Sequence, residues 1–134
     1  MFLGSWEPSF DLKSKRLALP KKIRDYLATS VIILSYGFEK CIFAFDTKYW
    51  EKETQKQLDR PVDDRAARDL RRFFFSGAER VTLDFQGRIV IPNNLLLWAE
   101  IKKPIIIGAG DHFEIWEKVT WQKYSAKIQN LPKT

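Results

Sequence analysis

The segment Asp11-Leu-Lys-Ser-Lys-Arg16-Leu-Ala-Leu-Pro20 returns later in the chain as Asp84-Phe-Gln-Gly-Arg88-Ile-Val-Ile-Pro92. Each copy has an acidic residue, a short turn, an arginine, three aliphatic residues and a proline. A pattern of this length that occurs twice indicates an internal repeat, which has to be settled before any local feature.

The residues that follow the two segments correspond as well. The stretch Tyr36-Gly-Phe-Glu-Lys-Cys-Ile-Phe43 leads to Trp50, and Gly108-Ala-Gly-Asp-His-Phe-Glu-Ile-Trp116 leads to Trp121. The arginines of the two segments are 72 positions apart and these tryptophans 71, so the register holds to within one residue. The chain is therefore built twice from one plan. We interpret the two tryptophans as packing residues rather than as platforms for stacked bases.

The composition is typical of one globular domain with an excess of positive charge. The 134 residues are 45% hydrophobic and include five Trp and ten Phe, whereas disordered chains contain few aromatic residues. The formal net charge of +6 favours a polyanionic partner such as nucleic acid. The single cysteine, Cys41, excludes an internal disulfide, and the apolar runs are far shorter than the roughly 20 residues that cross a bilayer. Met1–Glu7 does not resemble a signal peptide. A lone buried thiol is consistent with the reducing cytoplasm, where we expect the protein.

Prolines mark the same elements in both halves. Strands at 16–19 and 88–91 are expected to end at Pro20 and Pro92, which lack a backbone N–H but suit the first turn of a following helix. Two halves of about 70 residues with short strands cannot each close a core alone. The sequence therefore predicts an α+β fold in which the halves interlock as a pseudo-twofold β-barrel with peripheral helices.

A hairpin and a helix complete each half. Strands on either side of Gly37 and of Gly108-Ala-Gly110 predict the two hairpins, and Asp46 can cap the helix after the first of them. Between the halves, Pro61 is expected to open a helix whose apolar face runs from Val62 to Phe74. The arginines on another face of that helix, which we interpret as a solvated surface, are Arg65, Arg68 and Arg72.

The turn of each repeat can present basic side chains together at one end of the molecule. Lysine neutralises phosphates, whereas arginine can also form paired hydrogen bonds with guanine in the major groove. The candidate DNA-binding residues are Lys13, Lys15, Arg16 and Arg88, with the two arginines assigned to base contacts. We expect the first turn to dominate the electrostatic contact, because Lys21, Lys22 and Arg24 follow it in the sequence.

An alternative reading leaves the turns without a ligand. Asp11 and Asp84 could hold Arg16 and Arg88 in ion pairs that only shape the backbone. Spacing alone does not separate this structural role from DNA binding.

Catalytic and metal-binding motifs are missing from the sequence. It has no glycine-rich phosphate loop, no HExxH and no paired CxxC. His112 and Cys41 occupy equivalent positions of the two repeats, and equivalent positions need not meet. We expect no enzymatic activity, no cofactor and no metal, and a hydrolase built from carboxylates and His112 is the enzymatic alternative.

The doubled pattern resembles the MraZ family of bacterial transcriptional regulators, which carry two SpoVT/AbrB-like repeats, each marked by Asp-x-x-x-Arg before a hydrophobic-Pro ending. The opening Met1-Phe-Leu-Gly4 and the segment Phe113–Trp116 look similar too, and the similarity runs to about Tyr124. The resemblance implies an interlocked barrel of swapped hairpins and a ring-shaped, octamer-like homo-oligomer. It also implies a nucleoid-associated regulator that binds short direct repeats of double-stranded DNA in the promoter of the division and cell-wall gene cluster, including its own gene.

The family pattern carries over unevenly. The residues that match it in the second copy are Asp84, Gly87, Arg88 and Pro92. The first copy has one residue more between Asp11 and Arg16, so either Lys15 takes the arginine's place or the turn bulges to keep Arg16 there, four residues before Pro20. Lys15 also stands where the family has glycine, so we predict a different loop in the first copy, with Ser14 in the turn.

The repeat and the resemblance divide the chain into four parts. These are a first SpoVT/AbrB-like repeat at 5–48, connecting helices at 49–76, a second repeat at 77–120, and a C-terminal helix and tail at 121–134. The leading hypothesis is a sequence-specific DNA-binding regulator of transcription. The alternative outside DNA binding is a protein-interaction or antitoxin-like assembly module, because AbrB-like barrels also serve in that role.

Overall fold

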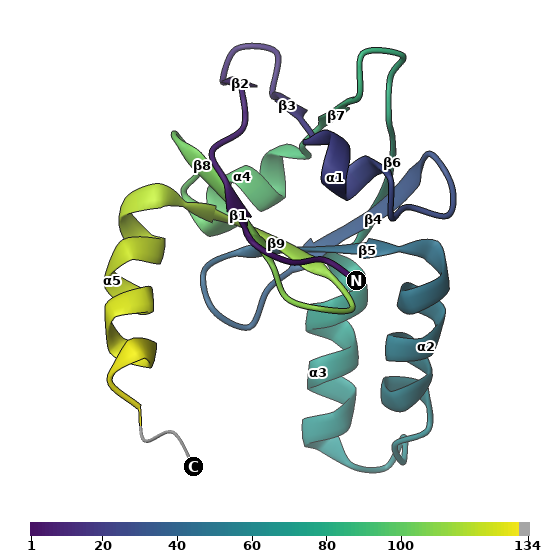
Figure 1. Cartoon of the computed structure of the whole chain (residues 1–134). Coiled ribbons are helices and arrows are strands. Elements are labelled where there is room, and N and C mark those ends of the chain that lie inside the picture. The colour runs from purple at the N-terminus through teal and green to yellow at the C-terminus, as the bar shows by residue number, and fades with distance from the viewer. Residues whose placement is uncertain (132–134) are drawn as a thin grey trace.

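The two copies of the repeat form two antiparallel sheets (Figure 1). The structure, a computed structural model, describes residues 1–131, so residues 132–134 of the expected C-terminal tail lie outside the described part. The strands are β1 (Ser5–Trp6), β2 (Phe10–Asp11), β3 (Arg16–Ala18), β4 (Val31–Tyr36), β5 (Ile42–Asp46), β6 (Glu79–Thr82), β7 (Arg88–Val90), β8 (Pro104–Gly108) and β9 (Phe113–Glu117). The helices are α1 (Lys21–Arg24), α2 (Thr47–Leu58), α3 (Arg65–Ser76), α4 (Asn93–Ala99) and α5 (Lys118–Gln129).

The fold is α+β, as predicted, but a closed barrel is wrong for the described residues. The larger sheet has the strand order β1-β8-β9-β5-β4-β6, and the smaller one has the order β2-β3-β7. Strand β3 pairs with β2 on one side and with β7 on the other, which leaves β1 and β6 as the two edges of the larger sheet. Both sheets are therefore open.

Strand exchange interlocks the two copies. The first strand of each copy pairs with the hairpin of the other copy, because β1 lies beside β8 and β6 lies beside β4. The two hairpins join through β5 and β9 at the centre of the sheet. Read from either edge, the larger sheet therefore has equivalent strands in the same order, which is the pseudo-twofold symmetry that the repeat predicts.

The same pseudo-twofold symmetry relates β3 and β7. These strands pair antiparallel with Leu17 opposite Ile89, and neither side chain is exposed to solvent. The backbone N–H of Leu19 donates to the carbonyl oxygen of Gly87 at 3.0 Å, and that of Ile91 donates to the carbonyl oxygen of Lys15 at 2.9 Å. The residue after each strand is therefore hydrogen-bonded to the turn of the other copy, and the two hydrogen bonds are equivalent.

The prolines act as predicted. Pro20 and Pro92 are the N-cap residues of α1 and α4, with φ of −58° and −59°. Behind these helices lies the core that both copies share, and its largest fully buried side chains include Leu17, Ile32, Leu34, Ile42, Ile89, Leu95, Ile106 and Phe113. The ribbon of β3 and β7 is thus held from below by side chains of both repeats.

The three longer helices lie on the far side of the sheets from the turns (Figure 1). Asp46 begins α2 as predicted, because its Oδ1 accepts the N–H of Lys48 at 3.1 Å and its Oδ2 accepts that of Ala28 at 2.9 Å. Trp50 stacks on Phe74 with ring centroids 5.1 Å apart. In the second copy Trp121 packs against Trp116 at 5.2 Å. The assignment of both tryptophans to packing is confirmed.

Helix α3 begins later than predicted. Its N-cap is Asp64, whose Oδ1 accepts the N–H of Ala66, so Pro61 and Val62 lie in the preceding loop and Val62 is exposed. The carboxylate of Asp64 satisfies a free N–H of the first turn, which a proline at the start cannot do.

The arginine side chains of α3 form ion pairs and hydrogen bonds with nearby residues of α2, of α3 and of the loop between them. Arg72 pairs with Asp69, and Arg68 donates to the carbonyl oxygen of Val62. Arg71 donates to three carbonyl oxygens at the end of α2 and in the loop after it, those of Gln57, Leu58 and Arg60. These contacts favour a structural and solvated role for this helix face rather than a phosphate track.

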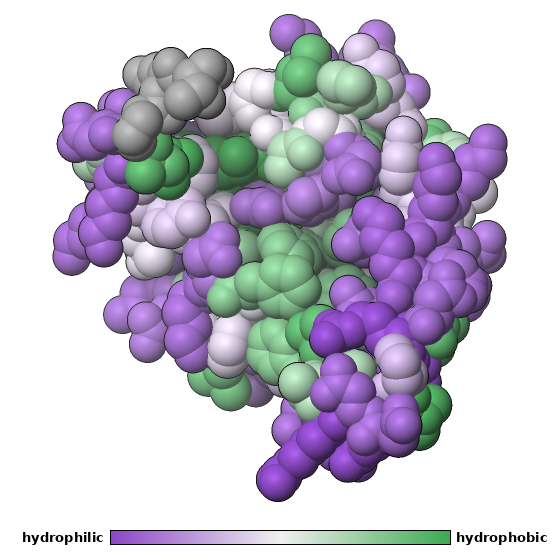
Figure 2. Space-filling view, turned by 90° about the horizontal axis from the view of Figure 1, so that it is seen from below, coloured by the Kyte–Doolittle hydropathy of each residue, from purple (hydrophilic) through white to green (hydrophobic). Residues whose placement is uncertain are grey.

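Apolar side chains gather on the face opposite the turns, as Figure 2 shows between the polar surfaces at its two sides. Phe38, in the loop between β4 and β5, is 55% exposed there and packs edge-on against Phe43. A cavity of about 190 Å³ is lined by Phe38, Phe43, Phe45, Glu53, Phe74, Asp111 and His112. We call the surface around Phe38 and this cavity the lower apolar face.

Candidate nucleic-acid interface

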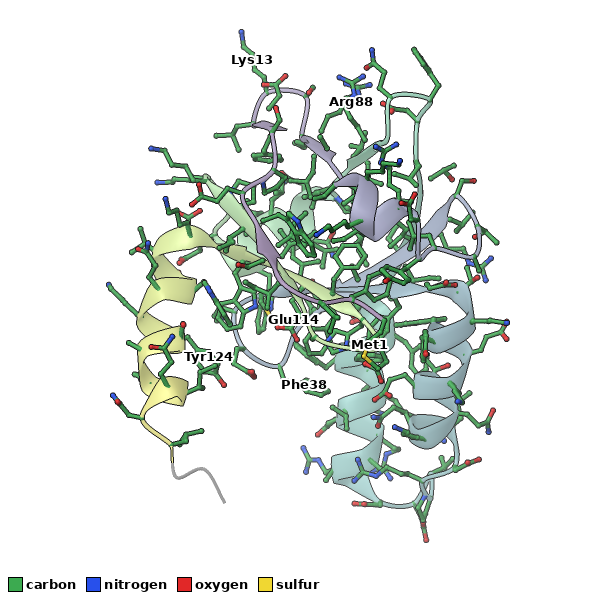
Figure 3. The ribbon with its side chains drawn as sticks, viewed as in Figure 1. Met1, Lys13, Phe38, Arg88, Glu114 and Tyr124 are labelled. Atoms are coloured by element: carbon green, nitrogen blue, oxygen red, sulfur yellow. The ribbon has the colours of Figure 1, made fainter. Side chains whose placement is uncertain are left out.

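The two repeat turns rise from the same side of the molecule (Figure 1). One joins β2 to β3 and the other joins β6 to β7, and they stand at opposite ends of the ribbon that β3 and β7 form. Lys13 on the first turn and Arg88 beside the second both lie at this end of the molecule (Figure 3). The predicted DNA-binding residues are therefore brought together on one side, although they come from distant parts of the sequence.

The second turn is held by Asp84. Its Oδ1 accepts the backbone N–H groups of Gln86 at 2.8 Å and Arg88 at 2.9 Å. Its Oδ2 accepts the Nε of Arg88 at 3.0 Å, and the Arg88 side chain remains 38% exposed. The backbone hydrogen bond from Arg88, followed by that side-chain bond, keeps the pKa of Asp84 below its ordinary value. Asp84 thus shapes the turn and fixes the direction of Arg88.

The first turn is held differently. The Oδ1 of Asp11 accepts the N–H of Lys13 at 3.1 Å and its Oδ2 accepts the hydroxyl of Ser14 at 2.8 Å. The hydrogen bond from Ser14 is the main cause that lowers the pKa of Asp11. Within residues 1–131, the guanidinium group of Arg16 has neither an ion-pair nor a hydrogen-bond partner. The alternative in which an aspartate holds the arginine of its turn in an ion pair therefore applies to Asp84 and Arg88, but not to Asp11 and Arg16.

Backbone angles show how the longer first turn is accommodated. Lys15 has a φ of +61° and Gly87 a φ of +76°, so both adopt the left-handed conformation. Lys15 therefore takes the place of the glycine, and Arg16 corresponds to Arg88. The additional residue lies before Lys15, which confirms a different loop in the first copy.

Substitutions at these two positions should have opposite effects on stability. Gly87→Ala is expected to lower the free energy of unfolding by about 1–2 kcal/mol, because an L-residue is strained at positive φ. Lys15→Gly should leave it unchanged or raise it by up to about 1 kcal/mol, because it removes that strain but adds freedom to the unfolded chain. Urea unfolding of both variants measures the difference. Equal destabilisation by the two substitutions would contradict the assignment of Lys15 to the glycine position.

Arg24 belongs to the second turn, although it follows the first in the sequence. A Cβ built on Gly87 would lie 3.0 Å from Cδ, Nε and Nη1 of Arg24, so this side chain packs directly against the second turn. Its Nε donates to the carbonyl oxygen of Leu19 at 3.1 Å. The expectation that Arg24 adds to the first turn is wrong, because β3 pairs antiparallel with β7, so the end of β3 and the following α1 lie beside the second turn. The pseudo-twofold pairing of the strands is the only signal that could have revealed this.

The corresponding surroundings of the first turn are less basic. A groove of about 460 Å³ beside it is lined by Leu12, Lys15, Asn93, Leu96, Leu97, Glu100, Ile101 and Lys102. Leu96 of α4 is 72 positions after Arg24 in the repeat, so a buried leucine replaces the arginine here. The positive charge is therefore shared between the two turns more evenly than the sequence order indicates.

The residues considered for catalysis do not form a site. Cys41 is fully buried, and burial raises the pKa of its thiol, so it cannot supply a thiolate near neutral pH. His112 lies between two carboxylates, with Nδ1 2.8 Å from Oδ1 of Asp111 and Nε2 2.8 Å from Oε2 of Glu114. In the described part of the chain, no group of three His, Cys, Asp or Glu side chains is arranged to hold a metal ion. None of the helices in that part could cross a membrane.

His112 should make stability depend on pH. Burial acts to lower the pKa of His112, but the hydrogen bonds and charges of Glu114 and Asp111 outweigh it and raise the pKa above its ordinary 6.5. The stabilisation by the protonated ring is complete below pH 6.5 and is lost as the pH rises through the raised pKa. Urea unfolding at about pH 5.5 to 8.5 should show this decrease in the wild type and not in His112→Gln. The same slope in both proteins would assign it to other groups.

Comparison with known proteins agrees with the doubled architecture. The family model described as "MraZ protein, putative antitoxin-like" matches residues 1–73 and again residues 74–134. The chain is 44% identical over 123 residues to the transcriptional regulator MraZ of Roseiflexus sp. (strain RS-1), which covers 91% of this chain and 85% of that protein. It is 41% identical over 129 residues to the protein of the same name from Leuconostoc mesenteroides, covering 95% and 88%.

A third relative, the transcriptional regulator MraZ of Acetivibrio thermocellus, is 39% identical over 126 residues, covering 93% of this chain and 87% of that protein. In each of these relatives the identity extends over most of the length of both proteins. With the family model matching each half in turn, the chain belongs to the MraZ family.

Proposed function

We propose that this chain regulates transcription by binding double-stranded DNA with its two repeat turns. The observation that carries the proposal is the placement of Arg16 and Arg88 at equivalent positions of two turns that rise from the same side of a molecule of net charge +6. The relatives are named transcriptional regulators and not enzymes, which confirms the expectation of a non-enzymatic role and supports DNA as the partner.

Different side chains of the interface would have different tasks. Arg88, held by Asp84, is oriented before any ligand arrives, so a bidentate contact to a guanine would require little reordering. Arg16 is free to adapt to its base. Lys13 and Lys15 neutralise phosphates, and Arg24 adds a charge beside the second turn. Arginines thus specify the sequence, and lysines supply affinity that depends on salt.

The finer form of the proposal rests on the family. We infer that the binding sites are short direct repeats in the promoter of the division and cell-wall gene cluster, including the chain's own gene, and that the protein works in the cytoplasm at the nucleoid. A ring-shaped, octamer-like homo-oligomer would present many turns to repeated sites, so that avidity adds to the modest affinity of one chain. The lower apolar face supports self-association, because an exposed apolar surface of this kind is typical of protein contacts.

A salt series of DNA titrations tests the proposal. Fluorescence anisotropy would compare a duplex from upstream of the chain's own gene with a scrambled duplex of the same composition, at fixed protein concentration. We expect a preference for the native duplex that persists near physiological salt. Equal binding to both duplexes that falls steeply with salt would mean phosphate attraction alone and would contradict sequence recognition.

A protein-interaction module is the second candidate. The family description as antitoxin-like and the lower apolar face both favour a protein partner. Copurification with one fixed partner, together with no binding to either duplex, would select this function over transcription control.

A further inference from the structure

Phe85 stands at the tip of the second turn with 96% of its surface exposed. It directly follows Asp84, and the residue at the same motif position of the first turn is Leu12, which is 55% exposed. The two turns differ in length and in hydrogen bonding, yet both place an apolar side chain at this position. The recurrence sets Phe85 apart from a singly exposed hydrophobic residue, which would need no explanation.

The turn itself does not require a phenylalanine. Asp84 holds the backbone through the N–H groups of Gln86 and Arg88, and Gly87 supplies the positive φ. None of these contacts depends on the side chain at position 85. Covering an aromatic ring that is almost entirely exposed to water is favourable, so the ring at position 85 favours a binding partner.

The surroundings indicate which partner that is. Arg88 follows Phe85 by three residues, and Arg24 packs against Gly87 of the same turn. A surface that covers Phe85 must therefore accept positive charge at its edge and offer an apolar group at its centre. The major groove of DNA does both, because phosphates line it and the methyl group of thymine projects into it.

We propose that Phe85 contacts a thymine methyl group in the major groove, beside the base that Arg88 reads. This inference rests on the proposed function and deepens it by naming an apolar base contact of the second turn. The uncharged ring adds to sequence preference and not to salt dependence. The first turn, with Lys13 and Lys15 around Leu12, carries proportionally more of the phosphate contact.

Deoxyuridine provides the test, because it differs from thymidine only by the missing methyl group. Wild type, Phe85→Ser and the control Val62→Ser, which removes an exposed apolar side chain before α3, would be titrated with the upstream duplex and with the same duplex in which deoxyuridine replaces every thymidine. The wild type should bind the substituted duplex about fourfold more weakly for each contacted methyl, the equivalent of about 0.8 kcal/mol. Phe85→Ser should lose most of this thymidine preference while keeping the wild-type salt slope, and Val62→Ser should keep the wild-type ratio. Because position 85 is exposed, an unchanged melting temperature is expected and serves as the folding control.

The outcomes separate this inference from the proposed function. If the wild type prefers the native over the scrambled duplex and Phe85→Ser retains the full thymidine preference, the methyl contact is overturned while DNA recognition stands. The inference is also overturned if Phe85→Ser binds both duplexes like the wild type but loses self-association, which would assign the ring to a contact between chains. If the wild type binds neither duplex, both proposals fail together.

Discussion

Replacing Arg16 and Arg88 together by alanine is expected to weaken binding to the upstream duplex by about 2–6 kcal/mol, from about 1–3 kcal/mol for each lost bidentate base contact. The single substitution Arg88→Ala should cost more than Arg16→Ala. Loss of the Arg88 side chain leaves the Asp84 carboxylate at the proposed interface without its cationic partner, whereas Arg16 has no acidic partner among the described residues. Fluorescence anisotropy at one salt concentration measures all three variants.

Arg65 provides the matched control. Its side chain is 86% exposed on α3, away from the turns, and its Nε lies 3.9 Å from Oδ2 of Asp69 in a surface ion pair. Arg65→Ala removes the same charge and should change the affinity for the upstream duplex by no more than about twofold. A comparable loss in Arg65→Ala would mean that net charge and not the turns governs binding. An unchanged affinity in the double variant would place recognition elsewhere on the surface.

Leu17→Ala is expected to lower the free energy of unfolding by about 2–5 kcal/mol, a large part of the roughly 5–15 kcal/mol of an ordinary domain. Leu17 is fully buried at the centre of the ribbon, directly opposite Ile89. Truncation leaves a cavity, because the close-packed side chains around it cannot fill the space without moving. These side chains come from both repeats. Urea unfolding measures the loss.

Val90→Ala is the control in the same ribbon. Val90 is 46% exposed, so its truncation should cost less than about 1 kcal/mol. Ile89→Ala should resemble Leu17→Ala, and the double variant should deviate from additivity by about 0.5–3 kcal/mol because the two residues are in register. Strict additivity would contradict direct packing between the copies at this point.

Local features of the sequence predicted most of the elements. The prolines after each Arg-containing strand, the glycines of the hairpins and the cap at Asp46 act through neighbouring backbone groups, so one stretch of chain suffices to read them. The prediction of a closed barrel was wrong because closure of a sheet depends on whether its edge strands pair. The short strands β1 and β6 end the larger sheet, and no local pattern states whether a distant strand joins them.

The candidate site was predictable in its residues and less so in its geometry. Motif spacing placed Arg16 and Arg88, but a lysine at positive φ is uncommon, so propensity alone could not assign Lys15 to the glycine position. Arg24 was assigned to the wrong turn, because its neighbours depend on the antiparallel pairing of β3 with β7. The start of α3 was misplaced because Asp64 and Pro61 are both acceptable first residues, and the capping hydrogen bond decides between them.

The covalent joining of two pseudo-symmetric copies gives the interface a polarity. A dimer of identical chains on the same twofold axis would present identical turns and would suit an inverted repeat. Here the axis between β3 and β7 relates a turn with Leu12, Lys13 and Lys15 to a turn with Phe85 and Gln86. Turning the molecule end for end on a duplex therefore exchanges unlike side chains, so a bound chain would distinguish the two directions along the DNA.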